Sequence, residues 1–262
     1  MSRSPGLTTA LLFGYAFLYL PIALLVVWSF NESRMVTVWG GFSTKWYVEL
    51  AGNDGFLEAA LLSLKVAATS ATAALVLGTL AALALVRFGR FGGRGLFTGL
   101  VTAPLVMPEI ILGLAMLLLF VSLEQVVGWP DGRGFTTIAI AHTTVGMAYA
   151  TVVVRSRLVQ MDHSLEEAAM DLGARPIKVF FLVTLPVIAP SLAAAWLLAF
   201  TLSLDDVVVA QFVSGPGATT LPIEVFSSVR LGISPQVNAL GTIIVAVVAL
   251  MIFAAWRLTR KR

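Results

Sequence analysis

The stretch RSRLVQMDHSLEEAAMDLGARPIKVFFLVTLP, residues 155–186, lies between two long apolar segments and is far more polar than a connector between them needs to be. Ser164 is placed to cap a helix, with Glu167 three residues later as in a capping box. Gly173 is placed to end that helix in the left-handed region. Pro176 suits the first turn of a second short helix, Ile177–Leu182. The pattern predicts a helix–turn–helix.

The first of these predicted helices, Leu165–Leu172, has a surface of mixed character. An acidic stripe is expected from Glu166, Glu167 and Asp171, and the small side chains of Ala168 and Ala169 leave a flat face. Two interpretations are open. The segment is either an amphipathic loop held against its own protein or a docking element for a partner on the same side of a membrane.

The segments around this loop are strongly apolar. Of 262 residues, 58% are hydrophobic and 12% charged, and the mean hydropathy is +0.94. Soluble domains are about 25% charged, so lipid is the expected solvent. A helix needs about 20 apolar residues to cross a bilayer. Six stretches qualify, the fifth being too long for one straight span: about Leu7–Phe30, Leu61–Val86, Phe97–Leu123, Phe135–Val154, Phe181–Val213 and Val237–Trp256. The predicted fold class is an all-α, polytopic membrane protein of one domain, residues 1–262.

The positions of lysine and arginine predict the orientation of these spans. Cytoplasmic segments carry an excess of both residues. If the N-terminus is cytoplasmic, 12 of the 17 basic residues face the cytoplasm, and the C-terminus is cytoplasmic as well. The net charge of +3 then reflects topology and not nucleic-acid binding. The 12 residues are Arg3, Arg87, Arg90, Arg94, Arg155, Arg157, Arg175, Lys178, Arg257, Arg260, Lys261 and Arg262.

Carboxylates inside the apolar stretches are candidates for a substrate pathway, because charges within membrane spans are rare and often functional. Glu109 lies in the third stretch, next to Pro108, where a local bend is expected. Asp205 and Asp206 lie late in the fifth stretch. No lysine or arginine occupies the core of a span, so such a pathway would favour cations. Alternatively, Glu109 caps a helix or pairs with a partner. Because the two aspartates are adjacent, at most one is expected to face the pathway while the other caps or pairs.

Several chemistries have no support in the sequence. There is no cysteine, and the two histidines, His142 and His163, are far apart, so no metal site is expected. His142 is interpreted as an interhelical hydrogen-bonding residue. No GxxxxGK[ST] phosphate-binding loop is present, so the chain is not expected to be an ATPase or another enzyme.

The 155–186 segment resembles the EAA loop of ABC-importer permeases, whose pattern is EAA, three residues, G, nine residues, I-x-LP. Glu167, Ala168, Ala169, Gly173 and the Leu185–Pro186 pair match, and Val183 stands in place of the isoleucine. Two further stretches, 104–120 and 203–245, resemble the polyamine importer permeases, with the putrescine type the most similar.

This resemblance implies a type I ABC importer permease fold with a cytoplasmic coupling loop at about 155–186. It implies contact with an ATPase through Glu166, Glu167, Ala168, Ala169, Asp171, Gly173 and Pro186. The implied partners are a homologous permease, two ATPase subunits that bind the ATP and magnesium, and a periplasmic polyamine-binding protein. The 214–236 loop would contact that protein or gate the outer mouth of the path. The chain itself would bind no cofactor. The alternatives are a permease for another small solute, a secondary transporter, or a membrane protein without a transport role.

Overall fold

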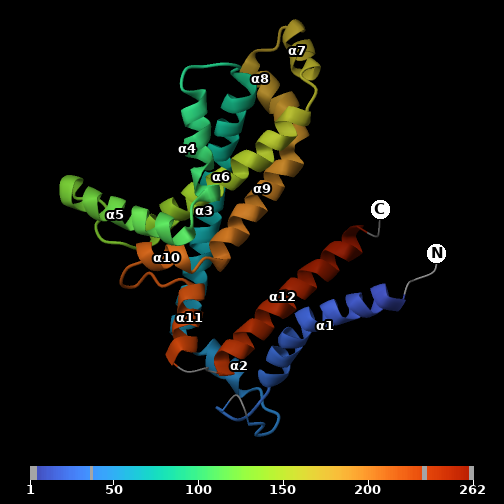
Figure 1. Ribbon diagram of the computed structural model, residues 1–262, viewed down its shortest axis with the longest axis vertical. Helices are drawn as coiled ribbons and strands as arrows, with labels where there is room; N and C mark the ends of the chain where they lie inside the picture. The colour runs from blue at the N-terminus through green and yellow to red at the C-terminus, as the bar shows by residue number, and fades with distance from the viewer. Residues whose placement is uncertain (1–4, 36–37, 232–234, 260–262) are drawn as a thin grey trace. The chain divides into compact units, whose positions relative to one another are not determined.

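The computed structural model describes residues 5–35, 38–231 and 235–259, and its regular elements are helices (Figure 1). The chain divides into two compact units, Met1–Leu57 with Glu224–Arg262, and Glu58–Ile223. Unit 1 contains α1 (Pro5–Trp28), α2 (Lys45–Ala51) and α12 (Pro235–Thr259). Unit 2 contains most of α3 (Asp54–Arg87), α4 (Arg94–Val106), α5 (Glu109–Val127), α6 (Phe135–Gln160), α7 (Ser164–Asp171), α8 (Pro176–Val179), a π-helix (Phe180–Thr184), α9 (Leu185–Asp205) and α10 (Val208–Val213). A further helix, α11 (Leu221–Leu231), begins in unit 2 and ends in unit 1.

The prediction of an all-α, polytopic membrane protein is confirmed. Within the described ranges, five helices are long and apolar enough to cross a membrane: Gly6–Trp28, Asp54–Arg87, Glu109–Val127, Phe135–Gln160 and Pro176–Asp205. The sixth predicted stretch forms α12. Leu12, Phe13 and Phe17 of α1 remain largely exposed within the chain, as expected for side chains whose solvent is lipid.

The third predicted span is not one helix. It divides into α4 and α5 at Met107, which is extended (φ −78°, ψ 136°), and Pro108 (φ −57°, ψ 135°). Pro108 has no N–H to donate, and its ring disfavours helical geometry at the preceding residue. The expected bend is therefore a complete break, after which α5 leaves in a different direction from α4 (Figure 1).

The fifth predicted span, Phe181–Val213, is indeed too long for one straight helix. It contains the end of the π-helix, then α9, then a break at the extended residue Asp206, and finally α10. In the π-helix the N–H of Leu185 donates to the carbonyl of Phe180, five residues back. Pro186 follows directly and cannot donate a helical hydrogen bond, which leaves an upstream carbonyl free and makes this wider register accessible.

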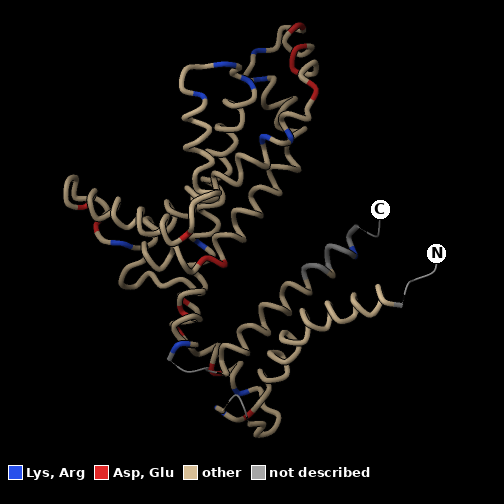
Figure 2. The backbone as a smooth tube through the Cα atoms, in the orientation of Figure 1, with Lys and Arg blue, Asp and Glu red and all other residues tan. Residues whose placement is uncertain are grey.

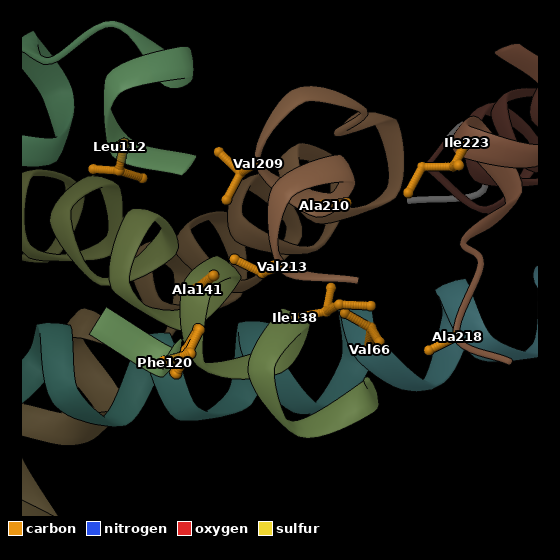
Figure 3. Close-up of a cluster of buried hydrophobic side chains, with 10 residues drawn as sticks. All are labelled: Val66, Leu112, Phe120, Ile138, Ala141, Val209, Ala210, Val213, Ala218 and Ile223. Atoms are coloured by element: carbon orange, nitrogen blue, oxygen red, sulfur yellow. The ribbon is translucent and has the colours of Figure 1, made fainter. Parts of the chain in front are cut away.

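Helix α6 lies at the centre of unit 2, which explains why its sequence is the least apolar of the predicted spans. Two of its threonines are buried and bonded: Thr137 Oγ1 donates to the carbonyl of Val213 at 2.7 Å, and Thr151 Oγ1 to that of Met147 at 2.7 Å. One core cluster joins α6 to α3, α5 and α10 (Figure 3), and its members are Val66, Leu112, Phe120, Ile138, Ala141, Val209, Ala210, Val213, Ala218 and Ile223.

In unit 1, α12 packs against α1 and α2, and the segment after α1 folds around Asn31. The buried Asn31 side chain donates to the Val38 carbonyl at 2.8 Å and accepts from the Gly40 N–H at 2.8 Å. The backbone carbonyl of Asn31 accepts from Trp46 Nε1 at 2.6 Å. This segment thus has one buried tryptophan, Trp46, and one half-exposed tryptophan, Trp39.

Candidate functional site

A cavity of about 520 Å³ lies in unit 2, where the two broken helices meet α6. The α4–α5 break forms one wall and the α9–α10 break another. It brings together all three predicted pathway carboxylates, Glu109, Asp205 and Asp206, although they come from separate parts of the sequence. The other lining residues are Pro104, Leu105, Met107, Pro108, Leu112, His142, Val145, Gly146, Tyr149, Ala199, Leu202, Ser203, Val207, Val208 and Val209.

Asp206 is held by structural hydrogen bonds. Its Oδ1 accepts from the N–H of Val209 at 3.2 Å and its Oδ2 from the N–H of Ala210 at 2.7 Å. The carboxylate therefore satisfies N–H groups at the start of α10 and offsets the positive end of that helix. The expectation that one of the two aspartates caps or pairs is confirmed for Asp206.

His142 connects this cap to the neighbouring helices. Its Nε2 lies 3.1 Å from Asp206 Oδ2, and its Nδ1 lies 2.6 Å from Ser203 Oγ. Ser70 Oγ of α3 is a further 3.3 Å from Ser203 Oγ. The contacts are satisfied when Nε2 donates to Asp206 Oδ2 and Nδ1 bonds to the Ser203 hydroxyl. The interpretation of His142 as an interhelical hydrogen-bonding residue is confirmed.

Glu109 and Asp205 occupy different electrostatic positions at the cavity. Glu109 is exposed and is the first residue of α5, where a carboxylate is stabilised by the positive helix end. Asp205 is exposed and is the last residue of α9, where the helix end is itself negative. A negative charge at that position is unfavourable for the fold alone.

The lining contains no lysine or arginine. Its remaining polar groups include the half-buried Tyr149 and backbone groups at the helix breaks. The cavity is therefore a negatively charged compartment with partly apolar walls formed by Leu112, Val145 and Leu202. These properties suit a cationic ligand with an apolar carbon chain.

The polar loop contains the second candidate site, α7. Gly173 has φ +83°, as predicted for the residue that ends this helix. The N–H of Gly173 donates to the Met170 carbonyl at 2.8 Å and that of Ala174 to the Ala169 carbonyl at 3.1 Å. This pair of bonds is a Schellman motif, which requires a left-handed residue that glycine provides without strain.

The start of α7 differs from the prediction. Ser164 is the first residue of the helix and not its cap, and no capping box with Glu167 forms. Asp162 takes the place of the expected cap, because its Oδ1 accepts from the Ser164 N–H at 3.0 Å. The hydrogen bonds from Ser164 hold the pKa of the Asp162 carboxyl below its usual value. Glu167 instead contacts His163 Nδ1, at 3.0 Å.

The second predicted helix, Ile177–Leu182, is also not a separate element. Helix α8, the π-helix and α9 follow one another without interruption, so the turn at Gly173 leads directly into the membrane helix. The helical conformation was predicted because Pro176 marks its start. The continuity was not predicted, because the sequence pattern indicated a separate short helix before the fifth span.

The acidic stripe expected on α7 is wrong at one position. Glu167 and Asp171 are exposed, but Glu166 is buried, with a residue exposure of 8%. Arg87 at the end of α3 approaches it with Nε at 2.9 Å from Oε2 and donates from Nη2 to Oε1 at 3.2 Å. Thr184 Oγ1 of the π-helix donates to the same Oε1 at 2.6 Å. Sequence reasoning assigned Arg87 only to topology, because nothing local pairs residues 79 positions apart.

The exposed surface of the 155–186 segment is unusually apolar for a polar loop. Leu172 is 91% exposed, Ile177 74% and Leu182 65%. Ala168 and Pro186 are exposed as well. Exposed apolar side chains next to exposed charges mark a surface suited to a protein partner.

Most of the lysine and arginine positions of unit 2 lie at the end that carries α7 (Figure 2). The chain segments there are the α3–α4 turn, the end of α6 and the turn before α8, which hold Arg87, Arg90, Arg94, Arg155, Arg157, Arg175 and Lys178. This grouping matches the charge pattern used to predict a cytoplasmic side, and the orientation itself stays a prediction. Arg3, Arg260, Lys261 and Arg262 lie outside the described residues.

Comparison with known proteins identifies relatives along nearly the whole chain. Residues 74–261 match the family described as "Binding-protein-dependent transport system inner membrane component". The "Putrescine transport system permease protein PotI" of Escherichia coli K12 is 58% identical over 259 residues, 99% of this chain and 92% of the relative. The "Spermidine/putrescine transport system permease protein PotC" of the same organism is 41% identical over 257 residues, 98% of this chain and 94% of the relative.

Solved structures share the fold at low sequence identity. A bacterial ABC transporter involved in the import of the acidic polysaccharide alginate matches with a TM-score of 0.71 at 17% identity, over 99% of both chains. The alginate transporter in complex with its alginate pentasaccharide-bound periplasmic protein gives a TM-score of 0.72 at 17% identity, over 94% of this chain and 89% of the other. The type I ABC importer permease fold predicted from the sequence is thereby confirmed. The chain belongs to the family of inner membrane components of binding-protein-dependent transport systems and is a multi-pass protein of the bacterial inner membrane.

Proposed function

We propose that this chain is a permease subunit of an ATP-driven polyamine importer of the putrescine type. The observation that carries the proposal is the cavity, in which Glu109 and Asp205 are exposed and no lysine or arginine is present. The two similar permeases from Escherichia coli, whose names specify putrescine or spermidine and putrescine, support the same substrate class.

The three carboxylates of the cavity have different roles in this proposal. Asp206 is committed to the start of α10 and to His142. Glu109 and Asp205 are free to meet the two ammonium groups of a diamine. The position of Asp205 supports this role, because a carboxylate at the negative end of α9 gains a favourable partner only when a cation is bound.

The chain forms half of a translocation path together with a homologous permease. A periplasmic binding protein delivers the polyamine at the outer face, where the 214–236 loop receives it. The structure places α11 in this loop, and residues 232–234 lie outside the described residues. Residues 1–262 act as one permease domain with both termini in the cytoplasm.

The motor lies on another chain. Two ATPase subunits bind ATP and magnesium and dock on the coupling loop of each permease. The surface of α7 supports this assignment, since Ala168, Leu172 and Ile177 are exposed beside Glu167 and Asp171. This chain binds no nucleotide, metal or nucleic acid in the proposed mechanism and carries out no covalent chemistry.

Uptake by the reconstituted complex tests the proposal. The complex of this permease, its partner permease, the ATPase and the binding protein is placed in liposomes with labelled putrescine. Unlabelled putrescine and spermidine should compete for uptake, and an anionic polysaccharide should not. Uptake that is unaffected by excess polyamine would contradict the proposed substrate class. Purification of the permease complex with no associated ATPase would contradict the ATP-driven mechanism.

A further inference from the structure

The buried cluster of Arg87, Glu166 and Thr184 joins three elements at the end of unit 2 that carries α7. Arg87 is the last residue of α3, Glu166 lies in the first turn of α7, and Thr184 is the last residue of the π-helix that leads into α9. The side chains of Arg87 and Glu166 are only 17% and 11% exposed. One carboxylate therefore ties the loop helix to two membrane helices.

Both carboxylate oxygens of Glu166 are in contact with other side chains, and Oε2 also lies 3.6 Å from Nε2 of the exposed His163. Its Oε2 meets Arg87 Nε at 2.9 Å, and its Oε1 accepts from both Arg87 Nη2 and Thr184 Oγ1. One hydrogen bond, from Nη2, and the short Nε–Oε2 ion-pair contact bring the guanidinium against both carboxylate oxygens, so the end of α3 is held close to the first turn of α7.

The π-helix determines where Thr184 lies. It inserts one additional residue per turn immediately before Pro186, and the side chains of that turn face differently from those of an α-helix. In this register Thr184 is buried and reaches Glu166 Oε1 at 2.6 Å. The register therefore links Pro186, at the start of α9, to the anchoring of α7.

The opposite face of α7 is available to a partner. Glu167, Ala168 and Asp171 are exposed, whereas Glu166 faces inward. Glu166 is thus separated from the surface that a docked protein would touch. A displacement of that surface by a docked protein reaches α3 and α9 through the buried side of α7, which carries Glu166.

We propose that Arg87, Glu166 and Thr184 form a joint of positioning residues through which displacement of α7 is transmitted to α3 and α9. The inference rests on the proposed function, because it requires an ATPase that moves α7. It assigns Glu166 to transmission within this chain and not to contact with the ATPase. Weakening the joint should allow nucleotide hydrolysis to continue while the membrane helices respond less.

The test uses the complete complex in liposomes, with polyamine uptake and ATP hydrolysis measured in the same sample. The variants are Arg87→Gln, Glu166→Gln and the double variant, with Thr184→Val removing the third contact. Each single replacement should lower the polyamine imported per ATP by roughly 2- to 30-fold. The double variant should lose no more than the stronger single one, because both remove the same ion pair. Arg90→Gln, an exposed arginine three residues from Arg87, is the control and should leave the ratio unchanged.

Three results would overturn the proposal that these residues form a joint. The first is an unchanged ratio of import to hydrolysis in both single variants. The second is losses that multiply in the double variant, which would mean that the residues act separately. The third is loss of the ATPase from purified Glu166→Gln complexes, which would make Glu166 a docking or folding residue. Failure of the proposed function is distinguishable, because wild-type complexes would then hydrolyse ATP without importing polyamine or would contain no ATPase.

Discussion

Asp206 Oδ2 lies 3.1 Å from Nε2 of His142. This contact distinguishes Asp206, which is held within the fold, from its neighbour Asp205. The same oxygen accepts from the N–H of Ala210, so Asp206 holds the start of α10 against α6. Asp205 is exposed at the end of α9. Asp206 therefore has a structural role, whereas Asp205 is the aspartate that we propose to bind the ligand.

Replacing the two aspartates separately tests this division. Asp206→Ala removes a helix cap and leaves His142 without its acceptor, so the free energy of unfolding should fall by about 1–3 kcal/mol. Asp205→Asn removes a charge from the negative end of α9 and should stabilise the protein by about 0.3–1 kcal/mol while it lowers putrescine uptake. Thermal unfolding in detergent and uptake in liposomes measure the two effects. Equal destabilisation by both replacements would contradict the assignment.

Glu109→Gln should weaken putrescine uptake by raising the substrate concentration needed for half-maximal rate, because a cation at the cavity loses one carboxylate. Assembly should be unaffected, since the exposed Glu109 side chain is not buried in the core. Initial uptake rates over a range of putrescine concentrations provide the measurement. Glu124→Gln is the matched control, because Glu124 is exposed on the same helix and does not line the cavity. Identical kinetics for both variants would make Glu109 a purely structural residue.

Glu167→Lys should separate ATP hydrolysis from transport, because it reverses a charge on the exposed surface of α7. Membrane insertion should be unchanged, as Glu167 is exposed and its side chain, within the described ranges, pairs with the neighbouring His163. The ratio of uptake to hydrolysis and the amount of co-purified ATPase report the defect. Wild-type values for both would contradict docking at this surface.

Gly173→Ala tests the turn that ends α7. An alanine at φ +83° costs about 1–2 kcal/mol in backbone strain, so α7 should be less well held and coupling should fall. Gly95→Ala in α4 is the control, because a Cβ there meets nothing within 4 Å. Gly173→Pro should have a stronger effect, since it also removes the N–H that donates to Met170.

Gly78→Val tests close packing between α3 and α6. A Cβ at Gly78 would lie 2.7 Å from the Cβ of Ala150 and 3.0 Å from the Met147 carbonyl oxygen. The helices would have to separate, at a cost of about 1–3 kcal/mol. The melting temperature of the purified complex should fall, whereas Gly99→Val, at an open position of α4, should change it much less. A melting temperature equal to that of wild type would show that the contact relaxes without strain.

The sequence was sufficient to predict which segments are helical, because long apolar runs have one main structural outcome in lipid. It also located Gly173 as the end of α7, since the left-handed region strongly favours glycine. It did not predict that Pro108 breaks a span completely, because proline in membrane helices produces either a kink or a break according to the neighbouring helices.

The side-chain pairs were less predictable than the helices. Glu166 and Glu167 are adjacent acidic residues, and only the three-dimensional structure shows that one faces Arg87 and the other faces outward. Similarly, the three carboxylates of the cavity were recognised individually, but their convergence depends on two helix breaks. Contacts between residues far apart in the sequence leave no local pattern.

The cavity charge originates at helix breaks and not on helix faces that pack together. Glu109 and Asp205 are exposed, so they contribute little to the core that joins α3, α5, α6 and α10. Substitutions at these two positions would change the charge presented to a ligand and leave the interhelical contacts intact. Under the proposed function, cargo preference in this architecture can therefore diverge during evolution by a few replacements at the breaks, without any redesign of the membrane scaffold.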